Sequence, residues 1–397
     1  MSIQEGGRRL FDRWAWAGFA AWAMMFCVVL LHTFFSSSLR NVTHIYRAAT
    51  RSFLNGETLY PLTKPVMGFL YLPGFATLYV PFEWMGHRLG DAAWKATGLG
   101  LLTYAAWSNC RDIDRELRLR VFSFALVISI PLVAGSFLNG QANIHLAAAC
   151  WLATLAAFRG QVVAVVFWTG IAVLAKPLAL VILLLVGAAR PRMIPALAAG
   201  IAWALALPFL VMDAQYVREL YGDCWRMLNE TAVASRFMAS DFSAIFIKLG
   251  WQVGDLYLTA IRCAAALAAL VMALWLGARL PRNAAALGIM ILGCGYMCLF
   301  NPRSEGLTYA VLALPCAIMI ALYFYQGQER ALWATAAAGV FLAGNSHITG
   351  DLLNLTRDWF RPTVFIFLFA LMTIAVAKTW AGDAQSTRLL ETKPSAP

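Results

Sequence analysis

A dozen long apolar stretches, separated by short polar connections, constrain this chain more than any other feature of its sequence. Of its 397 residues 61% are hydrophobic and 13% are charged, against about 25% charged in a soluble protein. A chain so poor in charge cannot cover a water-facing surface. We therefore predict an all-α polytopic membrane protein with about twelve membrane segments, at roughly 15–35, 92–110, 121–138, 142–158, 162–174, 177–189, 194–211, 256–279, 284–300, 307–325, 331–346 and 362–380.

Basic residues predict how these segments are oriented. Arg8, Arg9 and Arg13 precede the first stretch, which is too long for a signal-peptide core and has no small-residue cleavage site, so we expect a retained helix with a cytoplasmic N-terminus. Lys176-Pro177 interrupts the apolar run between Arg159 and Arg190. A lysine and a proline are costly in the middle of a straight span, so we predict an outer hairpin tip there. The resulting topology places both termini on the cytoplasmic side of a bacterial plasma (inner) membrane.

This topology divides the chain into one membrane domain and a tail. Residues 1–380 form the domain, and residues 381–397 are polar and are expected to be a disordered cytoplasmic end. In the first loop, residues 41–54 alternate apolar and basic side chains in the pattern of an interfacial helix. The long connections are predicted to lie outside, at 36–91, 213–255, 301–308 and 346–361.

Several basic side chains fall on the predicted outer face. The formal charge is +11, and only part of this excess lies at the cytoplasmic turns, where it is usual. Arg47, Arg51 and Lys176 lie outside, where they suit a lipid phosphate. The alternative is that the arginine side chains extend to the lipid headgroups and that the Lys176 side chain extends to the protein surface.

Two polar turns join predicted helices on the same outer face. The first, Asn139-Gly140-Gln141-Ala142-Asn143, offers three amides around a glycine, which suit hydrogen bonds to a hydroxyl-rich ligand or simple helix capping. The second, Asn301-Pro302-Arg303-Ser304-Glu305, contains a cation, an anion and an amide. These could bind a ligand, or Arg303 and Glu305 could pair and fasten the turn.

Sequence patterns of soluble catalysts do not occur in this chain. It has no phosphate-binding P-loop, no GxSxG, no HExxH, no GxGxxG and no CxxC pair, and its five histidines are scattered. We therefore expect no nucleotide or metal cofactor and no nucleic-acid partner. The basic excess is instead typical of a protein whose partners include membrane lipids.

The ordered set of motifs resembles the polytopic glycosyltransferases of the GT-C superfamily, and family eighty-seven most of all. That family includes mannosyltransferases that use polyprenyl-phosphate-mannose. The resemblance spans about residues 40–310 and is carried by Tyr46-Arg47-Ala48-Ala49, Leu54-Asn55-Gly56, Leu59-Tyr60-Pro61, Phe69-Leu70-Tyr71-Leu72-Pro73, Pro81, Asn139-Gly140-Gln141-Ala142-Asn143, Ala175-Lys176-Pro177 and Phe300-Asn301-Pro302-Arg303-Ser304-Glu305.

The resemblance implies a GT-C-like fold and a transfer reaction on the outer membrane face. A hexose, with mannose as the sugar it suggests, would pass in one inverting step from a polyprenyl-phosphate-linked donor to a lipid or cell-envelope glycan acceptor, without a cofactor. The phosphate of the donor would lie against Arg47, Arg51, Lys176 and Arg303. The sugar and the acceptor would contact Asn41, Tyr46, Tyr60, Asn139, Gln141, Asn143 and Asn301.

The chain departs from the resemblance at the catalytic base. The family's acid is expected just before the Tyr46 motif, where this chain has Asn41 and no carboxylate. An amide cannot accept the acceptor's proton, so another group must act. We rank Glu305 first and Asp241 second as the base. Other candidates are Glu57, Asp351 and His44.

Two other functions compete with the interpretation as an enzyme. A non-catalytic relative would bind polyprenyl-linked glycans or help assemble a cell-envelope synthesis complex, and the missing acid favours it. A transporter of lipid-linked sugars would need ionisable side chains near the membrane midplane, where the sequence offers chiefly Lys176 and Arg262.

Overall fold

The computed structural model describes residues 3–35, 41–60, 68–234, 240–327, 329–344 and 358–391, and every regular element within them is helical. Asp351 and most of the predicted outer loop 346–361 lie outside the described residues. An all-α fold is therefore confirmed for the part of the chain that the structure describes.

A helix stands at each of the twelve apolar stretches that the sequence predicts. The short polar connections end these helices as expected: Gly140 and Gly160 close two of them in the left-handed conformation, and the Asp114 carboxylate caps the start of another. The twelve are α1 (Ile3–Phe35), α4 (His87–Asn109), α5 (Arg115–Asn139), α6 (Asn143–Arg159), α7 (Val162–Ala175), α8 (Leu180–Ala189), α9 (Ile194–Ala206), α12 (Asp255–Arg279), α13 (Arg282–Leu299), α14 (Ala310–Gln326), α15 (Arg330–Gly344) and α17 (Phe360–Glu391).

Fewer of these helices are long enough to cross a bilayer on their own. Six candidate spans meet the length and hydropathy that a crossing requires, and four further apolar helices are shorter. The chain is thus a membrane-embedded helical protein, while the number of twelve segments and the cytoplasmic termini stay predictions. The six spans are Ala15–Phe35, Arg115–Asn139, Pro191–Leu210, Asp255–Arg279, Arg282–Leu299 and Gly306–Gln326.

The predicted break at Lys176-Pro177 is present. Helix α7 ends at Ala175, Lys176 is extended, and Pro177 opens a short 3₁₀ turn that leads into α8. The two halves have different neighbours, because α7 packs mainly on α6 and α9 whereas α8 packs mainly on α12 and α13. The break is therefore confirmed, and the hairpin stays a prediction.

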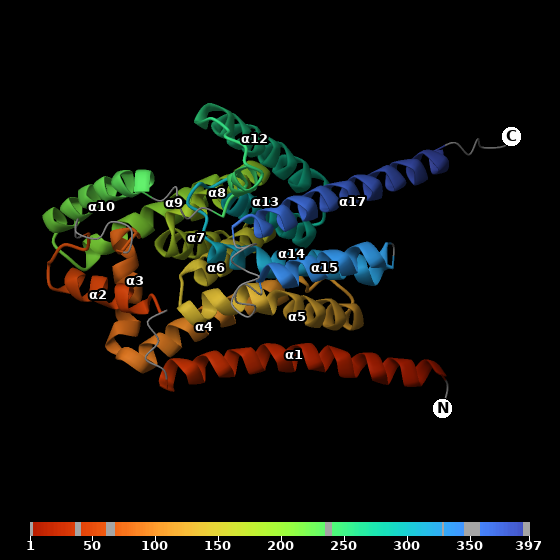
Figure 1. Cartoon of the computed structure of the whole chain (residues 1–397), viewed down its shortest axis with the longest axis horizontal. Helices are drawn as coiled ribbons and strands as arrows, with labels where there is room; N and C mark the ends of the chain where they lie inside the picture. The colour runs from red at the N-terminus through yellow and green to blue at the C-terminus, as the bar shows by residue number, and fades with distance from the viewer. Residues whose placement is uncertain are drawn as a thin grey trace.

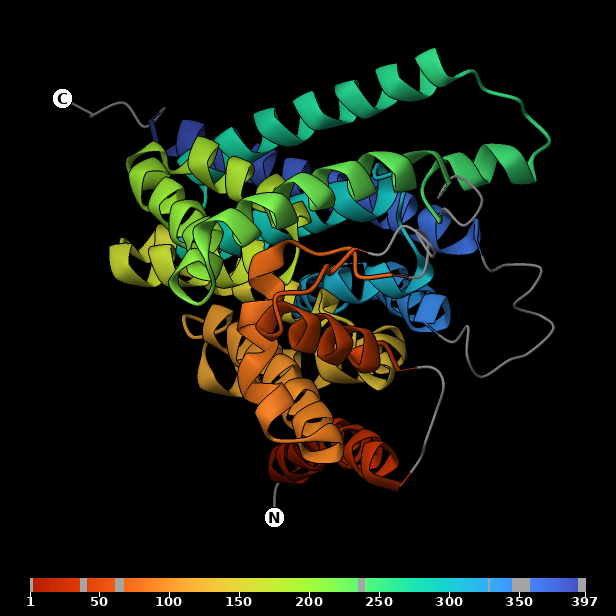
Figure 2. The ribbon, with the colours of Figure 1, turned by 90° about the vertical axis from the view of Figure 1, so that its left-hand side faces the viewer.

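The predicted outer loops carry helices of their own. The first contains α2 (Thr43–Leu54), which confirms a helix there while its interfacial position stays a prediction, and α3 (Pro73–Trp84); the second contains α10 (Ala214–Ala234) and α11 (Ser243–Lys248). Figure 1 shows α2, α3 and α10 at one end of the molecule and the start of α1 and the end of α17 at the other. Figure 2 views the first end directly, with α2 and α10 in front of the bundle.

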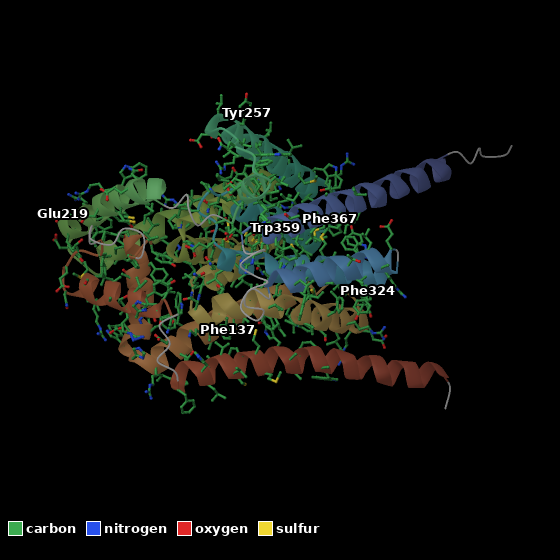
Figure 3. The ribbon with its side chains drawn as sticks, in the orientation of Figure 1. Phe137, Glu219, Tyr257, Phe324, Trp359 and Phe367 are labelled. Atoms are coloured by element: carbon green, nitrogen blue, oxygen red, sulfur yellow. The ribbon has the colours of Figure 1, made fainter. Side chains whose placement is uncertain are left out.

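Helix α6 forms the centre of the bundle. All of its residues from Asn143 to Phe158 are buried, because α4, α7 and α13 pack around it. Helix α5 packs in turn against α1, α14 and α15. Phe137 of α5, labelled in Figure 3, is buried and its ring stacks on Phe26 of α1 with 5.9 Å between the centroids.

A second, smaller core ties the outer helices to the bundle. It is largely aromatic and joins α2, α3, α4 and α10. Aromatic side chains bury a large apolar area and prefer defined edge-to-face arrangements. This core therefore fixes the outer helices against the bundle. Its largest buried members are Tyr46, Phe53, Phe75, Tyr79 and Trp94.

The structure differs from the prediction at the C-terminus. Helix α17 continues to Glu391, into the segment 381–397 that we expected to be disordered, and residues 392–397 lie outside the described residues. Alanine, glutamine, arginine, leucine and glutamate in this segment favour helix, so a helix that begins in the membrane can continue beyond it.

Candidate functional site

The turn between α5 and α6 touches the start of α2. Gly140 has φ of 72°, and a Cβ there would lie 2.7 Å from Cγ2 of Thr43, so both conformation and space require glycine. The backbone N–H of Val42 donates to the carbonyl of Asn139 at 2.9 Å. The two motifs that the sequence places far apart, 41–46 and 139–143, therefore form one surface.

Lys176 joins this surface from the break between α7 and α8. Its ammonium donates to Oδ1 of Asn143 at 2.9 Å, and Nδ2 of Asn143 donates to Oε1 of Gln141 at 2.6 Å. Burial lowers the pKa of Lys176, and the nearby Glu305 carboxylate acts in the opposite direction. Lys176 and Glu305 are thus within electrostatic reach of one another.

Glu305 is the accessible carboxylate of the site. Its side chain is exposed, and among the described residues it forms no ion pair. It lies in the turn between α13 and α14, which Ser304 anchors: its hydroxyl donates to the carbonyl of Met297 at 2.8 Å, and its carbonyl accepts from the N–H of Ser240 at 2.6 Å. A fixed turn thus carries a free, exposed carboxylate.

The rest of this turn is built around Arg303. The side chain of Asn301 accepts from the N–H of Arg303 at 3.1 Å, and the guanidinium of Arg303 donates to the carbonyl of Leu228 in α10 at 2.6 Å. Burial lowers the pKa of Arg303. The Arg303–Glu305 pair, the alternative to ligand binding in this turn, is not among the ion pairs of the described residues, and the turn is held by contacts to the backbone.

Two tyrosines of the aromatic core reach the same place. The hydroxyls of Tyr46 and Tyr71 lie 2.7 Å apart, and the N–H of Ala142 donates to the Tyr46 hydroxyl at 3.2 Å. Tyr60 is buried, and its hydroxyl donates to the carbonyl of Tyr71 at 2.7 Å. Tyr46 is 1% exposed, so its position suits support of the site better than contact with a ligand.

Asp241 is placed in a different environment. It is fully buried, its carboxylate pairs with Arg262 of α12 at 2.9 Å, and it accepts from the N–H of Ser243 at 3.1 Å at the start of α11. The Arg262 guanidinium also donates to the carbonyl of Phe300 at 3.1 Å. A carboxylate held in this way ties helices together and is not free to take a proton from a substrate.

Arg47 and Arg51 also already have partners. Arg47 is buried and pairs with Asp91 and, at 3.1 Å, with Glu83; Arg51, which is largely exposed, pairs with Glu83 at 2.5 Å. These contacts fasten α2 to α3 and α4. They favour a structural use of Arg47, while Arg51 keeps an exposed side.

Asn41 and His44 occupy the place where the resemblance expects an acid. Nδ2 of Asn41 donates to Oδ2 of Asp91 at 3.0 Å, and Nδ1 of His44 bonds to the backbone carbonyl of Asn41. Because a carbonyl can only accept, Nδ1 carries the proton and Nε2 of neutral His44 is left with its lone pair. His44 is exposed and so remains a second accessible base.

The structure therefore gathers some of the predicted residues and separates others. Around the 139–143 turn it brings together Tyr46, Asn139, Gln141, Asn143 and Lys176, with Glu305 within electrostatic reach; Asp241, Arg47 and Arg51 lie in ion pairs outside this group. Sequence reasoning missed Tyr71, Glu83 and Asp91. The need for counter-charges to Arg47 could have indicated the two acids, since a buried arginine is rarely unpaired.

No group of three or more His, Cys, Asp or Glu side chains among the described residues is arranged to hold a metal ion. All cysteines in these ranges are free thiols.

Comparison with known families gives one match. The sequence model of glycosyltransferase family 87 matches residues 69–302, more than half of the chain. The matched range includes Tyr71, the 139–143 turn, Lys176 and Asn301, and it ends just before Glu305. No curated protein and no solved structure matches the chain.

Proposed function

The chain belongs to glycosyltransferase family 87, and from this premise we propose that it transfers a hexose from a polyprenyl-phosphate-linked donor to a lipid or cell-envelope glycan. The membership makes it a membrane glycosyltransferase. The donor, the sugar (mannose in our proposal), the acceptor and the bacterial inner membrane are parts of the proposal.

The observation that carries the proposal is a free carboxylate and a partly buried cation in one polar site. Lys176 donates to Asn143 at 2.9 Å, and the exposed Glu305 carboxylate acts to raise its pKa. A transfer from a lipid phosphate needs these two functions, a base for the acceptor hydroxyl and a cation for the leaving phosphate.

The chemistry follows from these two roles. The Glu305 carboxylate takes the proton of the acceptor hydroxyl while the acceptor oxygen forms a bond to the anomeric carbon. The bond from this carbon to the phosphate oxygen breaks, and its electron pair leaves with the polyprenyl phosphate. Lys176, together with Arg303, stabilises the charge that develops on the phosphate. Attack from the face opposite the leaving group inverts the anomeric configuration.

The position of the outer helices supports a site on the outer membrane face. Helices α2, α3 and α10 lie at the end of the molecule opposite the start of α1 and the end of α17. If the termini are cytoplasmic, as the basic N-terminal flank predicts, the site opens to the side where lipid-linked sugars of this kind are used.

The test is a transfer assay with the purified full chain in lipid. Polyprenyl-phosphate-linked mannose and glucose, radiolabelled, are offered with a panel of lipid and envelope-glycan acceptors. We expect labelled product with at least one pair and an anomeric configuration opposite to that of the donor. Retention of configuration would overturn the one-step mechanism.

One observation favours a second candidate function. Asn41, at the position expected for the acid, gives its amide hydrogen to the buried Asp91, so the family's base is replaced by a structural contact. A non-catalytic relative that binds polyprenyl-linked glycans, or that scaffolds envelope assembly, would show tight donor binding in the same assay without any transfer.

A further inference from the structure

A groove lies between α1, α4 and α5 in the surface of the bundle. Its volume is about 550 Å³, within the range of roughly 300–1,000 Å³ that ligand sites occupy. Because its α1 side belongs to the candidate span Ala15–Phe35, the groove lies at membrane depth; α1 follows one side of the bundle in Figure 1. Its walls are mainly aromatic: Phe19, Trp22 and Phe26 of α1, Tyr104 and Trp107 of α4 and Phe122 of α5.

The walls of the groove offer few polar groups to a ligand. Trp22 donates from Nε1 to the Thr103 hydroxyl at 3.1 Å, and this hydroxyl donates to the carbonyl of Leu99 at 2.7 Å. The hydroxyl of Tyr104 accepts from Arg111 at 3.5 Å. The polar atoms of these wall residues therefore have partners within the protein, and the groove suits a hydrocarbon chain.

Gly100 keeps one wall of the groove open. It belongs to α4 and is exposed, and a Cβ at this position would meet no atom within 4 Å. At Gly98 of the same helix a Cβ would lie 2.5 Å from Cε1 of the His145 ring. The space beside Gly100 can therefore take a larger side chain without displacing the neighbouring helices.

Two arginines lie at the end of the groove, near the turn between α4 and α5. Cζ of Arg111 lies 5.9 Å from the ring centroid of Tyr104, and Cζ of Arg118 lies 4.8 Å from that of Trp107. Both rings line the groove. Arg118 also donates to the backbone carbonyl of Arg111 at 3.3 Å. Each guanidinium is thus held against a wall of the groove, and the two lie at the same end of it.

Neither arginine has an anionic partner in the part of the chain that the structure describes. Nε of Arg118 is buried and has no hydrogen-bond partner there. Two acids of the same turn are used elsewhere, since Asp114 caps α5 and Glu116 pairs with Arg120 at 3.8 Å. Asp112 is exposed and forms no ion pair within the described ranges. A partly buried guanidinium without a counter-ion is costly, so an anion at this end of the groove stabilises it.

We propose that this groove binds a membrane phospholipid with an anionic headgroup, with one acyl chain along the aromatic walls and its phosphate on Arg111 and Arg118. Hydrocarbon walls that end at two arginines match an amphiphile that carries its negative charge at one end. The bound lipid fills the space between α1 and α4 and adds contacts that hold α1, which packs otherwise on α5 and α4, to the bundle.

This lipid is distinct from the sugar donor of the proposed reaction. Helix α5 begins at Arg115, beside the two arginines, and ends at Asn139 in the polar site, and its 25 residues span about 37 Å. A donor whose phosphate lies at Lys176 cannot place the same phosphate at Arg111. The groove therefore takes a second lipid from the opposite leaflet, and its occupancy does not depend on sugar transfer.

The experiment measures lipid binding to the purified full chain. Phosphatidylglycerol and phosphatidylcholine with identical acyl chains are titrated into the delipidated protein in detergent, and native mass spectrometry and the melting temperature report binding. The test variants are Gly100→Leu, which fills the groove, and the double variant Arg111→Gln/Arg118→Gln, which removes its charge.

Two matched controls accompany these variants. Arg192→Gln removes an exposed arginine from the turn before α9. Gly222→Leu adds the same side chain at an exposed glycine of α10, where a Cβ also meets no atom within 4 Å. Leucine favours helix over glycine at both positions, so any difference between the two glycine variants comes from the groove.

We expect the wild type to retain one phosphatidylglycerol in preference to phosphatidylcholine, and its melting temperature to rise as phosphatidylglycerol is added. The double arginine variant should bind phosphatidylglycerol about 25-fold more weakly, from roughly fivefold per arginine at an anionic headgroup, with little change for phosphatidylcholine. Gly100→Leu should weaken the binding of both lipids. Arg192→Gln and Gly222→Leu should match the wild type.

Equal affinity of the wild type for the two lipids would overturn the proposal, and this comparison needs no variant to fold. Undiminished binding of phosphatidylglycerol in Gly100→Leu or in the double arginine variant would overturn it as well. If Gly100→Leu changes the oligomeric state and leaves lipid retention as it was, the groove is covered by a second copy of the chain and the proposal is wrong.

Discussion

Asn41 donates a hydrogen bond from Nδ2 to Oδ2 of the buried Asp91 at 3.0 Å. This contact occupies the position at which the family resemblance expects a catalytic acid. The carboxylate beside it is buried and ion-paired with Arg47, so it cannot replace the missing base in contact with a substrate. The contact makes position 41 part of the scaffold that holds α2 against α4.

Restoring an acid at this position should destabilise the protein. In Asn41→Asp two carboxylates lie at hydrogen-bond distance, and repulsion raises the pKa of the pair above its unfolded value. The native state then binds more protons than the unfolded state, so the lost stability returns as pH falls through the raised pKa. We expect a loss of about 1–3 kcal/mol at neutral pH, measured by thermal unfolding in detergent at pH 5 and pH 8.

The control is Asn55→Asp at the exposed end of α2, which should change stability by less than about 0.5 kcal/mol. Equal stability of Asn41→Asp and the wild type at both pH values would contradict the contact.

The two arginines of α2 should differ sharply when each is removed. Arg47→Ala leaves the buried Asp91 carboxylate without its cation and Glu83 with Arg51 alone, and we expect a loss of about 3–5 kcal/mol. Arg51→Ala removes a largely exposed pair and should cost less than about 1 kcal/mol. Chemical unfolding in lipid–detergent micelles measures both, and similar losses for the two variants would refute the structural assignment of Arg47.

Substitutions of the two predicted bases should likewise have different effects. Glu305→Gln removes an exposed, unpaired carboxylate, so transfer should fall by a factor of about 100 or more with an unchanged melting temperature. Asp241→Asn weakens the buried pair with Arg262 and should lower the melting temperature. Full transfer in Glu305→Gln would exclude Glu305 as the base, and His44→Gln, tested beside it, would then identify the exposed imidazole as the alternative.

The charge of Lys176 should set an alkaline limit on donor binding. Burial lowers its pKa, so the ammonium that holds the phosphate is lost at a lower pH than for an ordinary lysine, and donor affinity should fall there. Lys176→Arg should keep affinity to higher pH, because guanidinium stays charged. Arg192→Lys, an exposed position in the turn before α9, serves as the control and should leave the limit in place.

Lys176 should also affect stability, with a defined sign. Because its pKa is lower in the folded chain than in the unfolded chain, the unfolded state binds more protons between the two values, and stability should rise with pH in that window. Bound donor phosphate should reverse the trend by raising this pKa again. The assignment is contradicted if the melting temperature of the donor-free protein falls as pH rises across this window and falls equally in Lys176→Met.

Much of this arrangement could be predicted from the order of residues alone. Charge-poor apolar stretches require a membrane bundle, and the helix boundaries follow from glycines such as Gly140 and from the break at Lys176-Pro177, because these signals act within a few residues along the chain. Helix α2 follows from local amphipathicity for the same reason. The length of α17 could not be read in this way, since polarity alone does not distinguish a helix from a disordered tail.

The partners of charged side chains could not be read from the sequence. Arg47 and Asp241 appear as candidate site residues in the sequence, but their counter-ions, Asp91 and Arg262, come from other helices. The sequence by itself determined an all-helical membrane protein with its polar residues in a few connections, because hydrophobicity and turn chemistry are local properties. Only the tertiary structure decided which carboxylate is free and which is held in an ion pair, because ion pairs and hydrogen-bond chains depend on distances between segments that lie far apart in the sequence.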